Sequence, residues 1–311
     1  MSLFSVIKSF TPSYEPRLRV QFALAASSVD VQSGVMSIPT LALNNGRDLP
    51  AIGFGTYNLR GEPGAAAVAS AITTGYRLLD TALNYENEGA VGDGIRASGV
   101  DREDIIVTSK LPGRFHGYDE TFVGFEESRA LLGLDYVDLY LIHWPLPKVG
   151  KYLETWRAMI ELRDQGLVRS IGVSNFTIEQ LTRLADETGV VPAVNQVELH
   201  PRFPQAELRA FHTAHGIVTE SWSPLGNRSE ITAEPVITRI AADHGVTATQ
   251  AVLRWHVQLG AIPIPKSANP ERQQENIDLF GFELDDAEVS AISALESGRL
   301  WGGDPDTHEE F

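Results

Sequence analysis

The sequence predicts a (β/α)8 TIM barrel with an N-terminal β-hairpin and an extra C-terminal helix. Short apolar runs are spaced like buried parallel strands, amphipathic segments lie between them, and a glycine ends most of those segments. Each glycine stands where a helix ends in a left-handed residue. These glycines are Gly75, Gly99, Gly133, Gly166, Gly189, Gly216 and Gly260. Seven such helix-and-strand units that follow one initial strand give eight strands.

The first 35 residues differ in character from the rest. We expect residues 1–35 to be an N-terminal extension that is disordered or not native, with Met36 as the natural start, because the strand pattern begins only after Met36. A short apolar patch at 20–26 leaves a signal peptide as an alternative, although Gln21 interrupts it. Residues 36–311 are expected to form a single barrel domain.

The elements then follow in order. Residues 38–43 and 49–55 flank Asn45-Gly46, which predicts a hairpin with a primed turn. The later strands should be mostly apolar because helices and core cover both faces. We expect several of them at 76–79, 105–109, 137–142, 170–173, 194–197 and 217–221.

Capping signals mark two of the helices. Thr177 and Gln180 have the spacing of a capping box, which predicts a helix start. Residues 285–295 place Glu288 at the third helical position and apolar side chains on one face, so they predict the extra helix packed outside the barrel.

Composition limits the classes of ligand. The chain has 25 basic and 41 acidic side chains and a formal charge of −16, so its average surface would repel nucleic acid and anionic membranes. A phosphate-bearing ligand therefore needs a local basic pocket. The absence of cysteine excludes disulfides, thiolate catalysis and zinc–thiolate sites, and the histidine spacing favours no metal. Neither a G-x-G-x-x-G motif nor a phosphate loop occurs, so any nucleotide must bind at the barrel mouth.

Four residues that can handle protons stand at or just past predicted strand ends: Asp80, Tyr85, Lys110 and His143. In a parallel barrel these ends meet at one mouth. A lysine beside the phenol would favour its phenolate, a carboxylate would balance the lysine, and a histidine could hold a carbonyl oxygen. Such a set suits carbonyl reduction. Taken singly, an Asp, Tyr or Lys at a strand end is usually a hydrogen-bonded loop residue, and a lone histidine is more often structural.

From about residue 38 onward the sequence resembles the aldo-keto reductases. The motifs that carry this resemblance are GFGTYN at 53–58, LLDTALNYENE at 78–88, TSKL at 108–111, LIHWP at 141–145, GVSNF at 172–176, NQVELHP at 195–201, SWSPLG at 221–226 and IPKSANPERQQEN at 264–276. The chain is most similar to the bacterial branch that includes 2,5-diketo-D-gluconate reductases. The resemblance implies an NADPH-dependent oxidoreductase that reduces aldehydes or ketones, diketo sugar acids among them.

The resemblance also implies roles for individual residues. Asp80, Tyr85, Lys110 and His143 would form a catalytic tetrad with Tyr85 as the general acid. Trp222 would stack on the nicotinamide, and Lys266 and Arg272 would hold the 2′-phosphate. The implied cofactor-binding residues are Gly55, Thr56, Asp80, Ser174, Asn175, Gln196, Trp222, Ser223, Leu225, Lys266, Ser267, Arg272, Glu275 and Asn276. Tyr57, His143 and Trp144 would line the substrate pocket, one wall of which, the loop LPGRFHG after Lys110, departs from the family pattern.

Two other functions remain open at this point. Lys110 could act as the amine nucleophile of a Schiff-base aldolase, or the barrel could be a non-catalytic NADPH-binding sensor or accessory subunit. In either case we expect a small-molecule ligand, a cytoplasmic location and a monomer.

Overall fold

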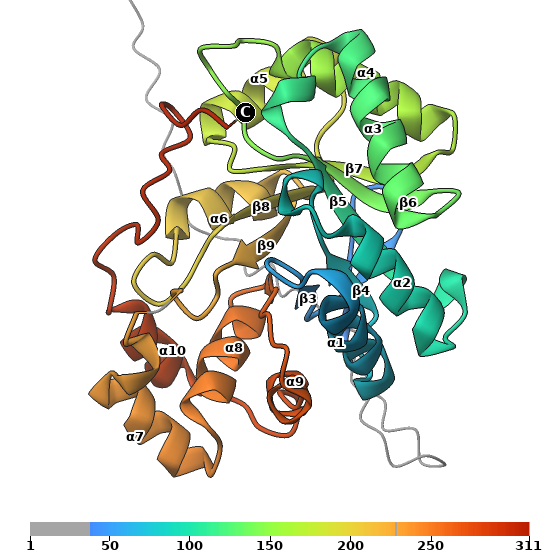
Figure 1. Ribbon diagram of the computed structural model, residues 1–311. Helices are drawn as coiled ribbons and strands as arrows, with labels where there is room; N and C mark the ends of the chain where they lie inside the picture. The colour runs from blue at the N-terminus through green and yellow to red at the C-terminus, as the bar shows by residue number, and fades with distance from the viewer. Residues whose placement is uncertain (1–37, 228, 311) are drawn as a thin grey trace, which may run out of the picture.

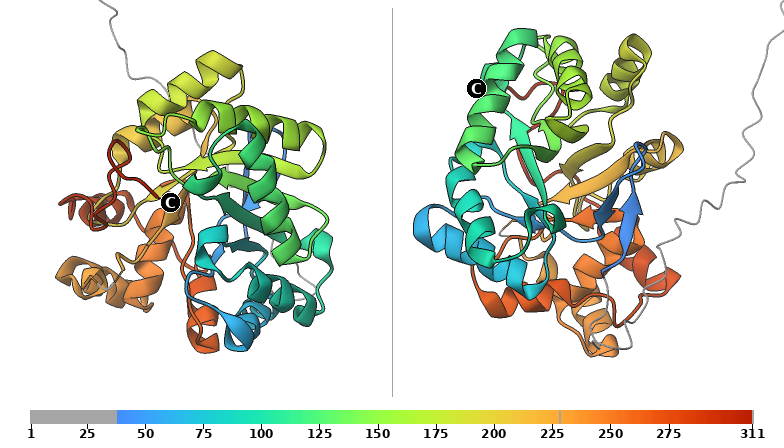
Figure 2. Two further views of the ribbon diagram at one scale, coloured as in Figure 1. Left: turned by 45° about the horizontal axis from the view of Figure 1, so that its top comes forward. Right: turned by 90° about the vertical axis from the view of Figure 1, so that its right-hand side faces the viewer.

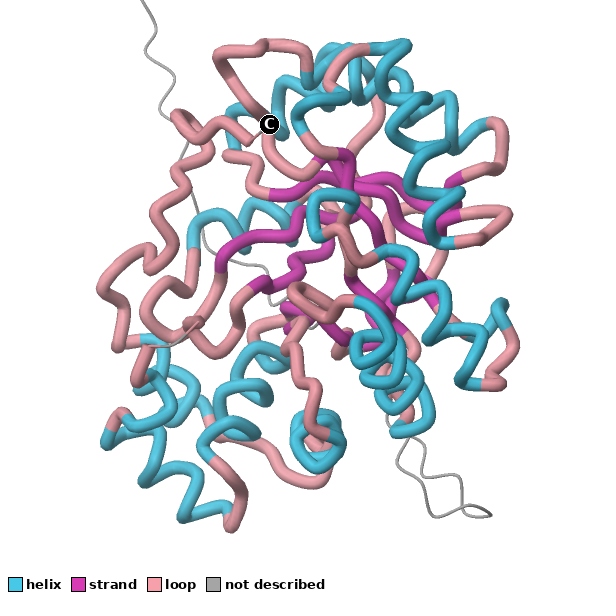
Figure 3. Tube along the Cα trace, in the orientation of Figure 1, coloured by secondary structure: helices cyan, strands magenta, loops and turns pink. Residues whose placement is uncertain are grey.

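A computed structural model of the chain describes residues 38–227 and 229–310. In these residues eight parallel strands form the centre of the fold, and the helices lie around them, as Figures 1 and 3 show. The strands are β3 (Phe54–Gly55), β4 (Leu78–Asp80), β5 (Ile106–Leu111), β6 (Val137–Ile142), β7 (Val168–Ser174), β8 (Val194–Glu198), β9 (Val218–Trp222) and β10 (Ala261–Pro263). The predicted barrel is confirmed, while the predicted extension at 1–35 lies outside the described residues.

Two backbone hydrogen bonds join the first and last strands of the sheet. The N–H of Gly53 donates to the carbonyl of Pro263 at 3.0 Å, and the N–H of Gly55 donates to that of Pro265 at 3.1 Å. A Cβ at Gly55 would lie 2.9 Å from the carbonyl oxygen of Ile264, so only glycine permits this approach. These bonds close the ring and bring β3 beside β10.

The helices begin and end largely where the sequence predicts. Thr177 and Gln180 form the expected capping box, and all seven helix-ending glycines have positive φ. The helices of the described ranges are α1 (Gly61–Thr74), α2 (Glu88–Ser98), α3 (Tyr118–Leu132), α4 (Tyr152–Asp164), α5 (Ile178–Thr188), α6 (Ala206–Ala214), α7 (Pro235–His244), α8 (Ala248–Gln258), α9 (Pro270–Ile277) and α10 (Asp286–Ser293). None of them is long and apolar enough to cross a membrane.

The N-terminal hairpin is present, but its turn differs from the prediction. Strands β1 (Thr40–Ala42) and β2 (Asp48–Pro50) pair antiparallel. A primed turn at Asn45-Gly46 needs a positive φ at Asn45, and only Gly46 has one, at 80°. The N–H of Gly46 donates to the carbonyl of Leu43 instead, so the chain makes an ordinary turn followed by a left-handed glycine. The prediction of a primed turn was therefore wrong.

The C-terminal part of the chain forms the predicted extra helix and then a long tail. Asp285 caps α10 by accepting from the N–H of Glu288, and Ile292 is buried against the outside of the barrel. Beyond α10 the chain runs, in red in Figure 1, from the α7–α8 side across to the side of α4 and α5. In the left view of Figure 2 its end lies in front of the strands.

One buried carboxylate bears on the stability of the barrel. Glu88, the first residue of α2, is 1 % exposed and accepts a 2.5 Å hydrogen bond from the Ser109 hydroxyl of β5. Its second oxygen has no partner among the described residues. Burial raises the pKa of Glu88 to about 7, although the hydrogen bond from Ser109 opposes that shift.

This raised pKa predicts a pH-dependent stability. An acid whose pKa is higher in the folded than in the unfolded state stabilises the fold below its unfolded pKa, and that contribution is lost as pH rises through about 7. The substitution Glu88→Gln removes this pH-dependent loss of stability, because a glutamine side chain does not ionise. The variant's free energy of unfolding relative to wild type should therefore increase between pH 5 and pH 8, by something on the order of 2 kcal/mol. Urea unfolding at both pH values measures it, and a difference that is the same at pH 5 and pH 8 contradicts it.

Candidate active site

The barrel brings the four candidate proton-handling residues to one end. Asp80 is the last residue of β4, Lys110 lies near the end of β5, and His143 directly follows β6; these three strands are neighbours in the sheet. Tyr85 ends the short helix η1 (Leu83–Tyr85), which follows β4. The structure thus places all four residues together, and we call them the tetrad.

Lys110 is the centre of the tetrad. Its Nζ donates to Asp80 Oδ2 at 2.8 Å, to the carbonyl oxygen of Thr81 at 3.0 Å and to the Tyr85 hydroxyl at 3.3 Å. These three bonds use all three protons of the ammonium. The Lys110 side chain is fully buried, and burial alone would lower its pKa, but the adjacent Asp80 and Tyr85 outweigh that effect and raise the pKa. Lys110 is therefore a fixed positive charge.

The Tyr85 phenol experiences two opposing influences. Burial raises its pKa, while the charge and hydrogen bond of Lys110 lower it. The sequence correctly indicates the direction of the lysine effect, but burial is larger, so the pKa of Tyr85 is raised overall. Tyr85 is consequently a neutral phenol that already has a cation within reach of its oxygen. The His143 ring also packs edge-to-face against Tyr85, with ring centroids 5.8 Å apart.

The residues expected to meet a nicotinamide ring also lie at this end. Ser174, Asn175, Gln196 and Trp222 line one cavity of about 690 Å³ together with the tetrad residues Asp80, Tyr85 and His143. Trp222 Nε1 donates to Asn175 Oδ1 at 2.8 Å, which fixes the plane of the indole. Asn175 Nδ2 donates to the carbonyl of His143 at 3.0 Å. The indole face and the histidine are therefore held by the same amide.

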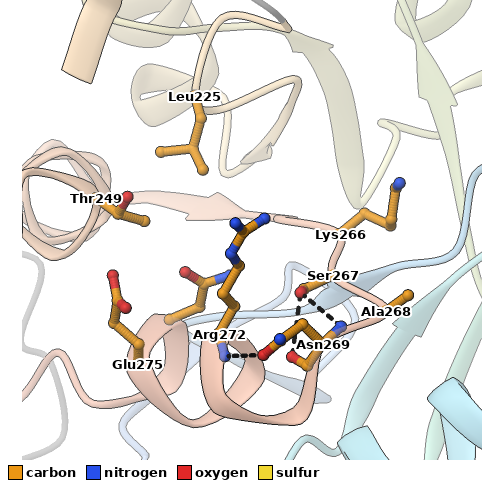
Figure 4. Close-up of a pocket in the computed structure, with 9 residues that line it drawn as sticks. Leu225, Thr249, Lys266, Ser267, Ala268, Asn269, Arg272 and Glu275 are labelled. Atoms are coloured by element: carbon orange, nitrogen blue, oxygen red, sulfur yellow. Dashed lines mark hydrogen bonds between the residues drawn. The ribbon is translucent and has the colours of Figure 1, made fainter. Parts of the chain in front are cut away.

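A second cavity, of about 550 Å³, continues from the first. The two share Leu225 and Lys266. The predicted residues Ser267, Arg272, Glu275 and Asn276 line this second cavity, and Figure 4 shows Arg272 extending from α9 toward Leu225.

The cations of the second cavity are available for an anion. Neither Lys266 nor Arg272 forms an ion pair with any carboxylate in residues 38–227 and 229–310. In a chain with formal charge −16, two unpaired cations beside one cavity make the local basic pocket that a phosphate needs.

The remaining predicted residues also border the first cavity. Gly55, Thr56 and Ser223 line it, as do the proposed substrate residues Tyr57 and Trp144. Arg114, from the loop after Lys110 that departs from the family pattern, lies in the same wall. In the described ranges, no group of three or more His, Asp or Glu side chains is arranged to hold a metal ion.

Sequence reasoning missed the contribution of the C-terminal tail. Glu198, the last residue of β8, accepts from the backbone N–H groups of Leu300 and Trp301 at 2.7 and 2.8 Å and pairs with Arg299 at 3.3 Å. This buried carboxylate holds the tail against the barrel. Trp301 then lines the first cavity and packs edge-to-face with Trp222, at 6.1 Å between centroids. No sequence motif in the tail predicts that it lines the cavity.

The end of the tail reaches the tetrad. His308 packs on Trp144, with ring centroids 4.2 Å apart, and Glu310 Oε1 lies 2.9 Å from His143 Nδ1. This is ion-pair distance, although the ring is not turned for a linear hydrogen bond. Burial would raise the pKa of Glu310, but His143, Asn84 and His308 outweigh it and lower the pKa. A Cβ at Gly113 would overlap the Glu310 carbonyl, so this glycine admits the tail.

Comparison with known proteins identifies the relatives of this chain. The model of the Aldo/keto reductase family matches residues 51–297. The 2,5-diketo-D-gluconic acid reductase B of a Corynebacterium species is 64 % identical over 275 residues, which cover 88 % of this chain and 99 % of that protein. The morphine 6-dehydrogenase of Pseudomonas putida is 48 % identical, covering 86 % and 94 %. The crystal structure of a Gox0644 mutant in complex with NADPH has a TM-score of 0.84, 46 % identity and coverage of 88 % and 99 %.

The buried ion pair predicts a large stability effect. Substituting Lys110→Met leaves the Asp80 carboxylate buried without its cation, so unfolding should become easier by about 3–5 kcal/mol. Urea denaturation measures this. The double substitution Asp80→Asn with Lys110→Met should cost less than the single one, because no unpaired charge remains.

A matched control separates burial from charge. Lys151 also pairs with a carboxylate, Glu120 at 3.9 Å, but is 45 % exposed, so Lys151→Met should change stability little. An equal effect of Lys110→Met and Lys151→Met would contradict the account of the buried pair.

Proposed function

The chain belongs to the aldo/keto reductase family and is therefore an oxidoreductase; we propose that it reduces aldehydes and ketones to alcohols, with NADPH as the cofactor and Tyr85 as the general acid. One observation carries the proposal. The Tyr85 hydroxyl lies 3.3 Å from a buried ammonium that is itself paired with Asp80 at 2.8 Å. A phenol needs such a neighbour to give up a proton near neutral pH.

The residues around the two cavities fit NADPH. Lys266 and Arg272 offer unpaired positive charge for the 2′-phosphate, and Trp222 offers an aromatic face whose plane is fixed by Asn175. The shared lining residues Leu225 and Lys266 make the two cavities continuous, as an extended dinucleotide requires. When bound, NADPH supplies the hydride that is delivered to the carbonyl carbon. NADPH complexes of related proteins support the same cofactor here.

The tetrad supplies the proton. Tyr85 donates its hydroxyl proton to the carbonyl oxygen as negative charge develops there, and Lys110 stabilises the phenolate left behind. Asp80 keeps Lys110 charged and in place. His143, which packs against Tyr85, donates a hydrogen bond to the same oxygen and orients the carbonyl.

The alternatives fit less well. A Schiff-base aldolase needs a neutral lysine, whereas the pKa of Lys110 is raised by Asp80 and Tyr85 and all three of its protons are engaged. A non-catalytic NADPH-binding sensor would leave the buried Asp80–Lys110 pair without a purpose, although that pair is costly to bury.

The substrate is a small carbonyl compound that fits beside Tyr57, Trp144 and the tail. The relative named as a 2,5-diketo-D-gluconic acid reductase supports diketo sugar acids as candidates. An anionic substrate of this kind would enter a cavity that already contains the Glu310 carboxylate. Cytoplasmic location and a monomeric state remain predictions.

The proton-transfer role predicts the effect of Tyr85→Phe. Reduction of a simple aldehyde should fall at least about 100-fold, because the general acid is lost. NADPH affinity, followed by quenching of tryptophan fluorescence, should stay within about twofold, because a phenyl ring fills nearly the same space. Undiminished turnover would exclude Tyr85 as the acid.

The basic pocket predicts cofactor preference. Substituting both Lys266→Ala and Arg272→Ala should weaken NADPH binding by about 10- to 100-fold, because charged hydrogen bonds to the 2′-phosphate are lost, and leave NADH binding nearly unchanged. Arg239→Ala, an exposed cation on α7, is the control. Equal losses for both cofactors would place the 2′-phosphate elsewhere.

The tail carboxylate predicts charge selectivity. Glu310→Gln removes a negative charge beside His143, so KM for 2,5-diketo-D-gluconate should fall about three- to tenfold while KM for a neutral aldehyde stays within about twofold. Glu309→Gln, its neighbour, serves as the control. Steady-state kinetics with both substrates measure the difference, and equal changes would show that the Glu310 charge does not act on the substrate.

A further inference from the structure

Another buried carboxylate outside the tetrad, Glu220, contacts Gln196, which lines the first cavity. Glu220 belongs to β9, is fully buried, and pairs in register with Gln196 of β8. The charged groups near it are Asp80 of β4 and Lys110 of β5. One of its oxygens, Oε1, has no partner among the described residues. The mechanism proposed above gives this costly group no task.

Gln196 connects Glu220 to the tetrad. Its Nε2 donates to Asp80 Oδ1 at 2.7 Å and to Glu220 Oε2 at 3.0 Å. Strands β8 and β4 lie four places apart in the sheet order, so the first of these bonds crosses the interior of the barrel. A side-chain amide has two N–H protons, and here each is used by a different carboxylate.

The two carboxylates together set the orientation of the amide. If the Gln196 amide turned over, its oxygen would face Asp80 Oδ1 and Glu220 Oε2, and acceptors would oppose acceptors. When Gln196 Nε2 donates to both carboxylates, the other amide atom of Gln196, Oε1, has no partner among the described residues. Gln196 also lines the first cavity. Asp80 alone could hold only one proton of the amide and would leave the other without a partner.

We propose that Glu220 is a positioning residue, which holds the second amide proton of Gln196 and so directs the Gln196 carbonyl oxygen into the cavity as an acceptor for the cofactor's carboxamide. This inference rests on the proposed use of NADPH. Glu220 touches neither substrate nor cofactor in this account and acts only through Gln196. A substitution of Glu220 should therefore change NADPH affinity only while the Gln196 side chain is present.

The charge state of Glu220 provides a second test of the proposal, because it should make NADPH binding depend on pH. Burial and the nearby Asp80 raise the pKa of Glu220 to about 7, while Gln196 and Lys110 oppose that shift. As pH rises through about 7, Glu220 gains its charge, and a charged oxygen accepts a hydrogen bond more strongly than a neutral one. Gln196 should be held more firmly at pH 8 than at pH 6.

A double-mutant cycle on NADPH binding tests the proposal. Affinities are measured by tryptophan fluorescence quenching for wild type, Glu220→Leu, Gln196→Ala and the double variant, at pH 8. Glu220→Leu should weaken NADPH binding about five- to tenfold in the wild-type background and have almost no further effect with Gln196→Ala. No loss in the wild-type background, or an equal loss in both backgrounds, overturns the proposal.

A second variant decides the matter if Glu220→Leu does not fold. Glu220→Gln has the same shape and keeps an acceptor oxygen, but it cannot titrate. The ratio of wild-type to Glu220→Gln affinity for NADPH should rise between pH 6 and pH 8 with a midpoint near 7. A flat ratio overturns the proposal. Failure of wild type itself to bind NADPH would instead contradict the proposed function, so the two failures are distinguishable.

Discussion

The interaction on which the site depends is the buried ion pair between Asp80 and Lys110. The lysine has no contact with water, so its charge is retained only because a carboxylate at 2.8 Å balances it and three acceptors use its protons. A buried cation of this kind cannot be screened by solvent. It therefore acts strongly on the hydroxyl of Tyr85, which lies 3.3 Å from its Nζ.

The closed barrel makes that pair geometrically possible. The tetrad comes from three neighbouring strands, while the residues that border it come from the opposite side of the ring, such as Gln196 of β8. The bonds from Gly53 and Gly55 that close the ring keep these opposite walls within hydrogen-bond distance. Residues separated by 116 positions, such as Asp80 and Gln196, thus become partners. The polar side chains at the barrel mouth form the candidate active site, and the apolar core below them stabilises the fold.

Much of the fold could be predicted from the sequence, because apolar runs, capping boxes and helix-ending glycines are local signals. The strand at 137–142 and the capping box at Thr177 agree with the structure, and the mouth gathers the tetrad because all parallel strands end there. The turn at Asn45 was predicted wrongly, because Asn-Gly also fits a three-residue loop in which only the glycine has a positive φ. The tail and Glu220 were missed, since their positions depend on contacts with residues far away in the chain.

The central proposal is that Lys110 lowers the pKa of the Tyr85 phenol against the effect of burial and so allows Tyr85 to act as the general acid. The most direct test is a pH titration of Tyr85 by NMR of tyrosine labelled with ¹³C at Cζ, with the signal assigned from Tyr85→Phe, in wild type and in Lys110→Met. Because the ammonium lowers the pKa of the phenol against the effect of burial, Tyr85 should ionise at a lower pH in wild type than in the variant. Ionisation of Tyr85 at the same pH in both proteins would contradict the account.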